Sequence, residues 1–184
     1  MSEGKTRLSS FNNTWYDPGA SFLKRGFWFC FNNVFFCSRF PFSGFKAALL
    51  RLFGARVGKN VIIRPGVNIK APWFLEIADN VWIGENVWID NLIKVTIASD
   101  CCISQGAMLL TGNHNYRKST FDLITKPIVL EEGVWIGAKA VVCPGIICRS
   151  HALLAVSSVA TSNLDAYGIY QGNPAVKIRE RKIS

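Results

Sequence analysis

Histidine is scarce in this chain, and metal-ligand patterns are absent with it. Only His114 and His151 occur among 184 residues. A zinc site is normally built from three or four Cys, His or carboxylate ligands at characteristic spacings. Cys101-Cys102 followed by Cys143 does not match such a spacing. The sequence therefore predicts no metal site.

Long apolar runs are also missing. The longest uncharged stretch in the aromatic-rich residues 22–53 covers residues 26–38, whereas a membrane-spanning helix needs about 20 apolar residues. The first twenty residues are polar and show no cleavable signal peptide. We therefore expect a cytoplasmic protein with free cysteines.

Acidic residues are few, with 12 Asp and Glu against 21 Lys and Arg. The basic excess lies at the two ends, because residues 57–164 are nearly neutral. Basic ends suit an anionic membrane surface, a polyphosphate ligand or nucleic acid. No nucleic-acid-binding motif is present, so we expect no nucleic acid partner.

A six-residue repeat is what the chain has in abundance. From Val57 to about residue 164, an aliphatic residue recurs every sixth position, followed four places later by a small or β-branched residue. Examples are Val57 to Val61, Ile63 to Val67, Ile83 to Val87, Ile97 to Cys101, Ile103 to Ala107, Ile136 to Ala140 and Val142 to Ile146. Such repeats predict an all-β fold, a parallel β-helix of stacked coils, over residues 57–164 of a single domain.

The repeat is interrupted in three places. The steps from Ile69 to Ile77 and from Ile89 to Ile97 take eight residues, which predicts small corner bulges. Residues 110–128 have no hexapeptide pattern, and the repeat resumes at Leu130. A loop of this length inside a compact fold is commonly functional.

Two segments flank the coils. Residues 1–56 form an aromatic and basic segment with expected helices. These helices either pack on the coils and a neighbouring subunit or lie at a membrane interface, and both interpretations remain open. Residues 165–184 are expected to form a C-terminal cap with a short helix after Pro174, covering the open edge of the last coil.

The two histidines receive different interpretations. His151 falls inside a hexapeptide and is expected to be a turn or surface residue. His114 lies at the start of the 110–128 loop. An imidazole titrates near neutral pH and can take a proton from a hydroxyl as a bond forms to that oxygen. His114 is therefore the candidate general base.

Hexapeptide coils, a loop histidine and the closing motif Gly172-Asn173-Pro174-Ala175 together resemble the left-handed β-helix acyltransferases that use acetyl-CoA. Over residues 46–183 the chain is most similar to the colanic acid biosynthesis acetyltransferases, which O-acetylate sugars of exopolysaccharide intermediates. The segments that carry this are Leu50 to Ala55, Gly58 to Val61, Ile63 to Pro65, Thr111-Gly112 before His114, Pro127 to Val129, and Gly172 to Arg181.

The resemblance implies a homotrimer of prisms with each active site between two of them. In that family the residue matching His114 deprotonates the acceptor for direct attack on the acetyl thioester. Asp90 and Asn91 match the place of a polar residue that binds the acceptor or orients the imidazole, and either can serve. The acceptor would be a sugar or a lipid-linked oligosaccharide.

The resemblance also implies where acetyl-CoA binds. The matching positions are Trp135, Gly137, Ala138, Ala155, Val156, Ser158 and Thr161, with Lys177 and Arg179 near the phosphates. Trp135 has a competing interpretation as a packing residue.

Three functions follow from these observations. The first is acetyl-CoA-dependent O-acetylation of a sugar in a cell-surface glycan precursor. The second is acetylation of a free sugar, an amino sugar or an antibiotic, and the third is a non-catalytic scaffold. The γ-type carbonic anhydrases share the fold but need three histidines, so that activity is excluded.

Overall fold

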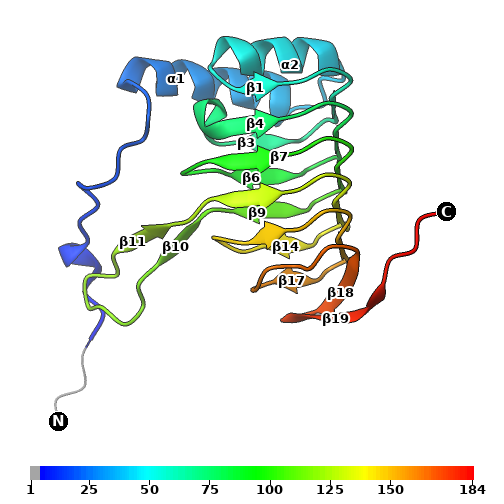
Figure 1. The fold of residues 1–184 in the computed structure, drawn as a ribbon. Coiled ribbons are helices and arrows are strands. Elements are labelled where there is room, and N and C mark those ends of the chain that lie inside the picture. Colours follow the sequence, from blue (N-terminus) through cyan, green and yellow to red (C-terminus); the bar gives the residue numbers. More distant parts are fainter. Residues whose placement is uncertain (1–4) are drawn as a thin grey trace.

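The coils stack into a left-handed β-helix with three flat sides (Figure 1). The structure is a computed structural model that describes residues 5–184; the first four residues of the predicted 1–56 segment lie outside it. Each side is a sheet whose coil strands run parallel, named here by its first strand, and one coil visits the β1, β2 and β3 sheets in turn. The β1 sheet holds β1 (Arg56–Val57), β4 (Leu75–Ile77), β7 (Val95–Ile97), β12 (Ile128–Leu130) and β15 (Ile147–Cys148).

The other two sides are built in the same way. The β2 sheet holds β2 (Ile62–Ile63), β5 (Trp82–Ile83), β8 (Cys102–Ile103), β13 (Trp135–Ile136) and β16 (Leu153–Leu154), followed by β18 (Gly168–Gly172) and β19 (Ala175–Glu180). The β3 sheet holds β3 (Asn68–Ile69), β6 (Trp88–Asp90), β9 (Met108–Leu110), β14 (Val141–Val142) and β17 (Val159–Ala160). The β-helix predicted from the repeat is confirmed.

The six-residue period works because one residue of each short strand faces inward and the next faces outward. Ile63, Ile83 and Ile103 lie in register on successive coils and are all fully buried. At the corners the backbone often takes the left-handed conformation, which Asn, Asp and Gly adopt at low cost. His151 occupies such a position with φ 59°, as expected for a turn residue.

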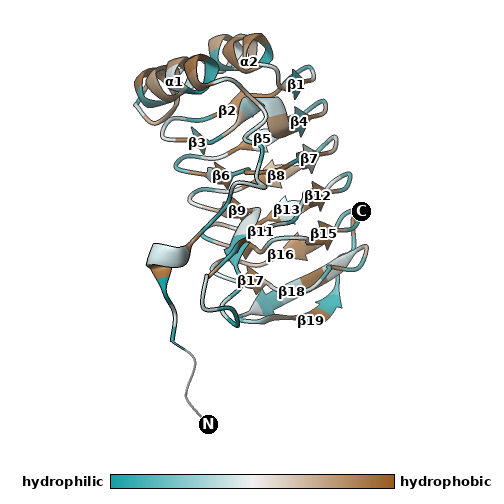
Figure 2. Cartoon of the chain, turned by 90° about the vertical axis from the view of Figure 1, so that its left-hand side faces the viewer, coloured by the Kyte–Doolittle hydropathy of each residue, from teal (hydrophilic) through white to brown (hydrophobic). Residues whose placement is uncertain are grey.

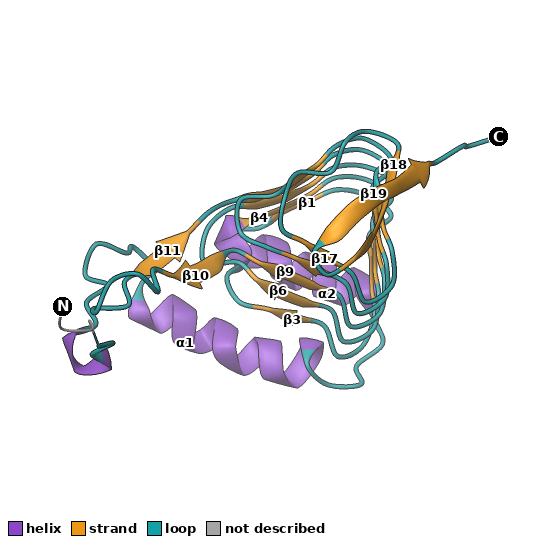
Figure 3. Cartoon of the chain, turned by 90° about the horizontal axis from the view of Figure 1, so that it is seen from below, coloured by secondary structure: helices purple, strands orange, loops and turns teal. Residues whose placement is uncertain are grey.

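One corner of the prism, between the β3 and β1 sheets, carries all three irregularities. The predicted bulges lie there, as the 3-10 turn η3 (Pro72–Phe74) and a turn at Leu92. On the next coil the 110–128 loop leaves the same corner as a β-hairpin of β10 (Gly112–His114) and β11 (Leu123–Thr125). Figure 3, a view along the prism, shows the hairpin projecting from that corner.

Two helices cover the first coil (Figure 2). Helix α1 (Phe22–Phe31) continues into the π-helical turn η2 (Asn32–Phe36) and buries Trp28, Asn32 and Phe36. Helix α2 (Ser43–Leu52) buries Lys46, Ala47, Leu49 and Leu50. Burial lowers the pKa of Lys46, whose ammonium donates to the carbonyl of Arg64 at 3.0 Å.

The chain before α1 forms an extended strap, residues 5–21, which includes the 3-10 turn η1 (Leu8–Ser10). It follows the irregular corner. The amide of Arg7 donates to the carbonyl of Ser119 in the hairpin, and the Tyr16 hydroxyl donates to the carbonyl of Leu92 at 2.8 Å. The strap therefore links the hairpin to the helical end of the prism.

The predicted C-terminal capping helix is wrong. Residues Ala175–Glu180 form strand β19, which pairs antiparallel with β18 at the last coil. Strand β18 would otherwise leave its backbone N–H and C=O groups open, and a returning strand satisfies them directly. Among residues 5–184, no helix is long and apolar enough to cross a membrane.

Candidate active site

His114 is held by the hairpin in a defined orientation. Its Nδ1 lies 2.9 Å from the carbonyl oxygen of Phe121 on the returning arm of the hairpin. Because a carbonyl can only accept, Nδ1 carries the proton in this contact, and Nε2 of the neutral ring keeps a free lone pair. The geometry thus prepares Nε2 to accept a proton.

Aromatic rings hold the imidazole as well. Phe121 stacks on it with 4.4 Å between ring centroids and 7° between planes. Phe11 of the strap approaches to 5.8 Å at 58°. The ring is therefore restrained by a hydrogen bond and by two neighbours from different parts of the chain.

Asp90 ends strand β6 and lies beside the root of the hairpin. Its register partner is Leu110, the last residue before the hairpin departs. The Asp90 carboxylate forms an ion pair with Lys70 at 2.9 Å, and its carbonyl accepts from the Thr111 hydroxyl at 2.9 Å. Asp90 thus faces outward near the loop that carries His114.

Asn91 points the other way. It is fully buried, and its amide donates to the carbonyl of Ala71 at 2.6 Å and accepts from the amide of Ala71 at 3.0 Å. Both ends of the side chain are therefore used inside the prism. Of the two residues proposed from sequence to assist His114, the structure leaves Asp90 available and gives Asn91 a structural role.

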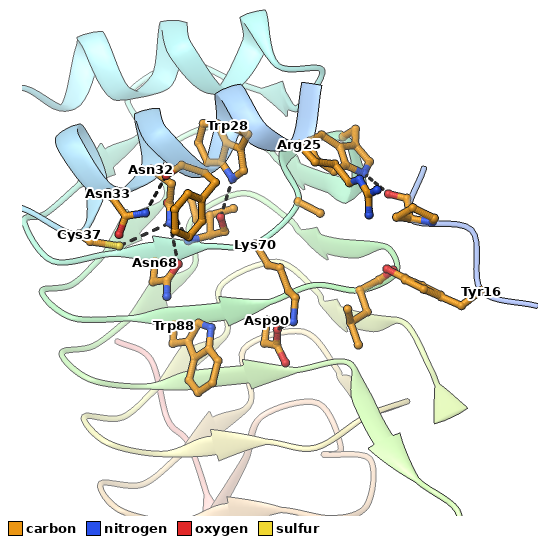
Figure 4. Close-up of a pocket in the computed structure, with 16 residues that line it drawn as sticks. Tyr16, Arg25, Trp28, Asn32, Asn33, Cys37, Asn68, Lys70, Trp88 and Asp90 are labelled. Carbon is orange, nitrogen blue, oxygen red and sulfur yellow. Dashed lines mark hydrogen bonds and ion pairs between the residues drawn. The ribbon is translucent and has the colours of Figure 1, made fainter. Parts of the chain in front are cut away.

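A pocket of about 420 Å³ opens between α1 and the β3 sheet, with Asp90 in its wall (Figure 4). Its walls combine aromatic rings with polar and charged groups. The aromatic lining is Tyr16, Trp28, Phe29, Trp73 and Trp88; the polar and charged lining is Arg25, Asn32, Asn33, Asn68, Lys70 and Asp90. Aromatic faces next to hydrogen-bonding groups suit a ring that carries hydroxyls.

Hydrogen bonds fix much of this lining. The Trp28 indole donates to the carbonyl of Ile69 at 2.8 Å, and the Asn32 amide donates to the Asn68 side-chain oxygen at 2.8 Å. Burial, and secondarily the charge of Asp90, raises the pKa of Tyr16. Tyr16 therefore stays protonated and keeps its hydrogen bond to the carbonyl of Leu92.

Most residues matched to the cofactor site gather at a second corner, between the β2 and β3 sheets. Trp135 lies on β13, 42% exposed, with its indole donating to the Ser104 hydroxyl at 2.9 Å. Gly137 and Ala138 follow in the turn, and Ala155 and Val156 form the same turn one coil later. The backbone links the two turns, since the amide of Gly137 donates to the carbonyl of Leu154.

Gly137 has a packing reason to be glycine. A Cβ at this position would lie 2.7 Å from backbone atoms of residues 154–156 on the next coil, so a side chain would push the coils apart. The predicted importance of a small residue therefore has a structural cause in the single chain.

The remaining cofactor candidates differ in accessibility. Ser158 is buried, and its hydroxyl accepts from the amide of Gly172 at 3.0 Å. Thr161 is exposed at the next corner of the prism, beyond β17. Lys177 and Arg179 lie on β19, where Lys177 pairs with Glu180 at 2.7 Å. The Ser158 hydroxyl thus binds the end of strand β18 in the C-terminal cap.

The hairpin leaves the prism at the carboxyl ends of the β3-sheet strands, whereas the cofactor corner lies at their amino ends. Within one chain, His114 and the turns at Gly137 and Ala155 are therefore separated by the width of that sheet.

Cysteines and possible metal ligands are the remaining reactive side chains. Within residues 5–184, no three His, Cys, Asp or Glu side chains gather as metal ligands. The cysteines are free, as predicted for six thiols. Burial raises the pKa of Cys101 to about 11 and that of Cys148 to about 12, which keeps both protonated.

A relative from Escherichia coli, assigned to colanic acid biosynthesis as the acetyltransferase WcaF, is 40% identical over 136 residues, covering 74% of this chain and 75% of the relative. The chain belongs to the hexapeptide-repeat acetyltransferases. The galactoside O-acetyltransferase of Escherichia coli is 25% identical over 138 residues, covering 73% of this acetyltransferase and 68% of that protein. No family model matches the chain.

Solved structures share the fold. The hexapeptide-repeat acetyltransferase VCA0836 of Vibrio cholerae, in complex with acetyl-CoA, aligns with a TM-score of 0.80 at 22% identity, covering 91% of this chain and 93% of that one. Galactoside acetyltransferase in complex with coenzyme A aligns with a TM-score of 0.77 at 22% identity, covering 87% and 82%. The protein is an acetyl-CoA-dependent acetyltransferase of the hexapeptide family, as the sequence resemblance predicted.

Most residues that line the pocket were not predicted from the sequence. Lys70, Trp88 and Tyr16 were not proposed as site residues. A signal existed for Lys70, because it lies twenty residues before Asp90, one full coil earlier in the same register. Tyr16 gave no signal, since its place follows from how the strap runs.

Proposed function

We propose that this acetyltransferase transfers an acetyl group to a sugar hydroxyl of an exopolysaccharide or related cell-surface glycan precursor. The observation that carries the proposal is the orientation of His114, with Nδ1 bound to a carbonyl and Nε2 free. The link to colanic acid biosynthesis in a 40% identical relative supports the substrate class.

The proposed chemistry is a direct transfer. Nε2 of His114 takes the proton of the acceptor hydroxyl while that oxygen attacks the carbonyl carbon of the acetyl thioester. The carbon–sulfur bond then breaks, and the sulfur of coenzyme A leaves and receives the proton. The products are an acetylated sugar and free coenzyme A, with no acetyl-enzyme.

The pocket between α1 and the β3 sheet is the proposed acceptor site. Trp88 and Trp73 offer aromatic surface to a sugar ring, and Asp90 and Lys70 offer hydrogen-bonding groups to its hydroxyls. Asp90 is the residue we propose to assist near His114. Acetyl-CoA is proposed to lie along the corner of Trp135, Gly137, Ala138, Ala155 and Val156, with Thr161, Lys177 and Arg179 toward its phosphates.

A homotrimer completes this proposal. The hairpin of one prism would reach the cofactor corner of its neighbour, which solves the separation of the two parts within one chain. We propose that the trimer acts in the cytoplasm.

Replacing His114 tests the mechanism. A general base contributes about 10²- to 10⁴-fold, so His114→Ala should lower kcat by at least about 100-fold while the Kd for coenzyme A changes little. His151→Asn is the matched control, because Asn tolerates the left-handed backbone at that position. A His114→Ala enzyme that keeps more than about a tenth of wild-type kcat would exclude the general-base role.

The substrate class needs a separate experiment. The surface polysaccharide of a strain lacking the gene should lose acetyl groups, measured by mass spectrometry against the wild type. Unchanged acetylation, with purified enzyme active on a free sugar, an amino sugar or an antibiotic, would transfer the proposal to that acceptor.

A further inference from the structure

We propose that the helical end of the prism is a binding surface for anionic phospholipid membranes. This end surface consists of the outward faces of α1 and α2 and the segment between them. It lies at the opposite end of the coil stack from β18 and β19 (Figure 1). The proposal concerns a partner of the protein and does not depend on which acceptor it acetylates.

Helix α2 presents the first apolar face. Its inner side is buried on the first coil, whereas Phe45, Ala48 and Leu52 are exposed. These residues are three and four positions apart, so they share one face of the helix. Leu52 is 77% exposed, and Phe42 just before the helix is 64% exposed. Leu52 is therefore the main apolar group that this helix offers to a partner.

Helix α1 adds a second apolar face beside it. Trp28 is buried, and Leu23 and Phe27 are 70% and 61% exposed on a different side of the helix. Val34, in η2, is 59% exposed. Large exposed apolar groups concentrated at one end of a protein commonly mark an interaction surface.

The charge around this surface identifies the partner. Between Asp17 and Glu76 the chain holds no acidic residue. The same stretch holds nine basic residues, which equals the whole net charge of +9, so the rest of the chain is balanced. They are Lys24, Arg25, Arg39, Lys46, Arg51, Arg56, Lys59, Arg64 and Lys70. Lys46 is buried, and Lys70 and Arg56 form ion pairs with Asp90 and Glu76, so the charge available to a partner comes from the other six. Apolar side chains surrounded by basic ones are complementary to an anionic lipid surface, in which aromatic and aliphatic groups enter the interface and cations meet phosphates.

Symmetry strengthens the contact. In a trimer of parallel prisms the three end surfaces face the same way, and prisms lying side by side leave the outer face of α2 uncovered. Each basic residue near an anionic leaflet strengthens binding about fivefold, and three linked copies bind far more tightly than one. The acceptor pocket lies under α1, so a membrane on this surface would place the site close to lipid-linked substrates.

The test is vesicle flotation of the full-length protein without substrates. Wild-type protein should float with vesicles of phosphatidylcholine mixed with phosphatidylglycerol, stay at the bottom with phosphatidylcholine alone, and be released by high salt. Leu23→Gln with Leu52→Gln should lower the bound fraction at least about tenfold, because each Gln keeps its helix and removes exposed apolar surface. Arg39→Glu should lower the fraction of protein that floats with the phosphatidylglycerol-containing vesicles.

Control variants use the C-terminal tail. Ile183 is 57% exposed and Lys182 is also exposed, so Ile183→Gln with Lys182→Glu makes the same kind of change away from the end surface and should float like wild type. Lys24 and Arg25 are unsuitable test positions, because Lys24 lies over the Trp73 ring and Arg25 lines the pocket.

Two results would overturn the proposal. The first is the loss of the expected flotation pattern, either because a wild-type protein that is folded by circular dichroism never floats or because the double Gln variant floats as well as the control. The second is a double Gln variant whose mass by light scattering falls to that of a smaller oligomer, which would make the surface a contact between copies of the chain. Neither result affects acetyl transfer to a dissolved acceptor, which is measured separately.

Discussion

Replacing Asn91 distinguishes a structural role from a catalytic one. Asn91→Ala removes two hydrogen bonds and leaves the N–H and C=O of Ala71 without these partners in a buried place, since Ala71 is only 5% exposed. Each buried polar group left unpaired costs about 1–3 kcal/mol, so the variant should lose about 2–6 kcal/mol of unfolding free energy. For a chain of this size the apparent Tm should fall by roughly 5–20 °C.

Thermal unfolding and steady-state kinetics on the same preparations make the measurement. Asn91→Ala should unfold early, yet keep kcat within about threefold of wild type per folded trimer at low temperature, because its side chain does not reach the pocket. Asn13→Ala, at an exposed asparagine of the strap, should leave Tm unchanged to within about 2 °C. A variant with wild-type Tm and a kcat lowered more than about 100-fold would refute this reasoning and return Asn91 to the chemistry.

Two further predictions concern assembly and packing. Light scattering should give about three times the chain mass of 20.5 kDa. Mixing inactive His114→Ala chains with inactive Ala138→Trp chains should restore about one quarter of wild-type activity, because about a quarter of the sites in random trimers combine an intact hairpin with an intact cofactor corner. No recovery in verified mixed trimers would place each site within one chain. Gly137→Ala should cost about 1–3 kcal/mol of unfolding free energy, because the added methyl group forces the coils apart. The control Gly44→Ala has open space around its Cβ position and should be neutral or stabilising. Equal Tm values for the two variants would refute the packing argument.

The repeat made the fold predictable, because the spacing of its inward-facing residues follows from the geometry of the coils. An inward residue such as Ile83 must recur where the next coil places Ile103, so spacing alone indicates strands, register and core. The C-terminal tail has no such record. Its residues are compatible with a helix, and only the open edge of β18 decides that Ala175–Glu180 become a strand.

The candidate site was predictable in part. His114 was singled out because its loop interrupts a regular pattern, and its role as a base stays a prediction. The inward position of Asn91 had a signal in the sequence: Asn91 follows inward-facing Ile89 by two residues, and alternation in a strand places both on the inner side. Its role in the site stays a prediction. The strap could not be foreseen, since the contact between Tyr16 and Leu92 joins residues 76 positions apart without any repeat.

The strap has a consequence for synthesis of the protein on the ribosome. It is made before its partners, which run from Trp73 through Leu92 to Ser119 and emerge much later. At about 5–20 residues per second, the nascent chain spends several seconds with the strap and the aromatic side chains of α1 unable to dock. The strap thus leaves the ribosome before its partners and is among the last segments to reach its place, and a bulky tag fused to it would travel to the side of His114, whereas a tag at the C-terminus would not.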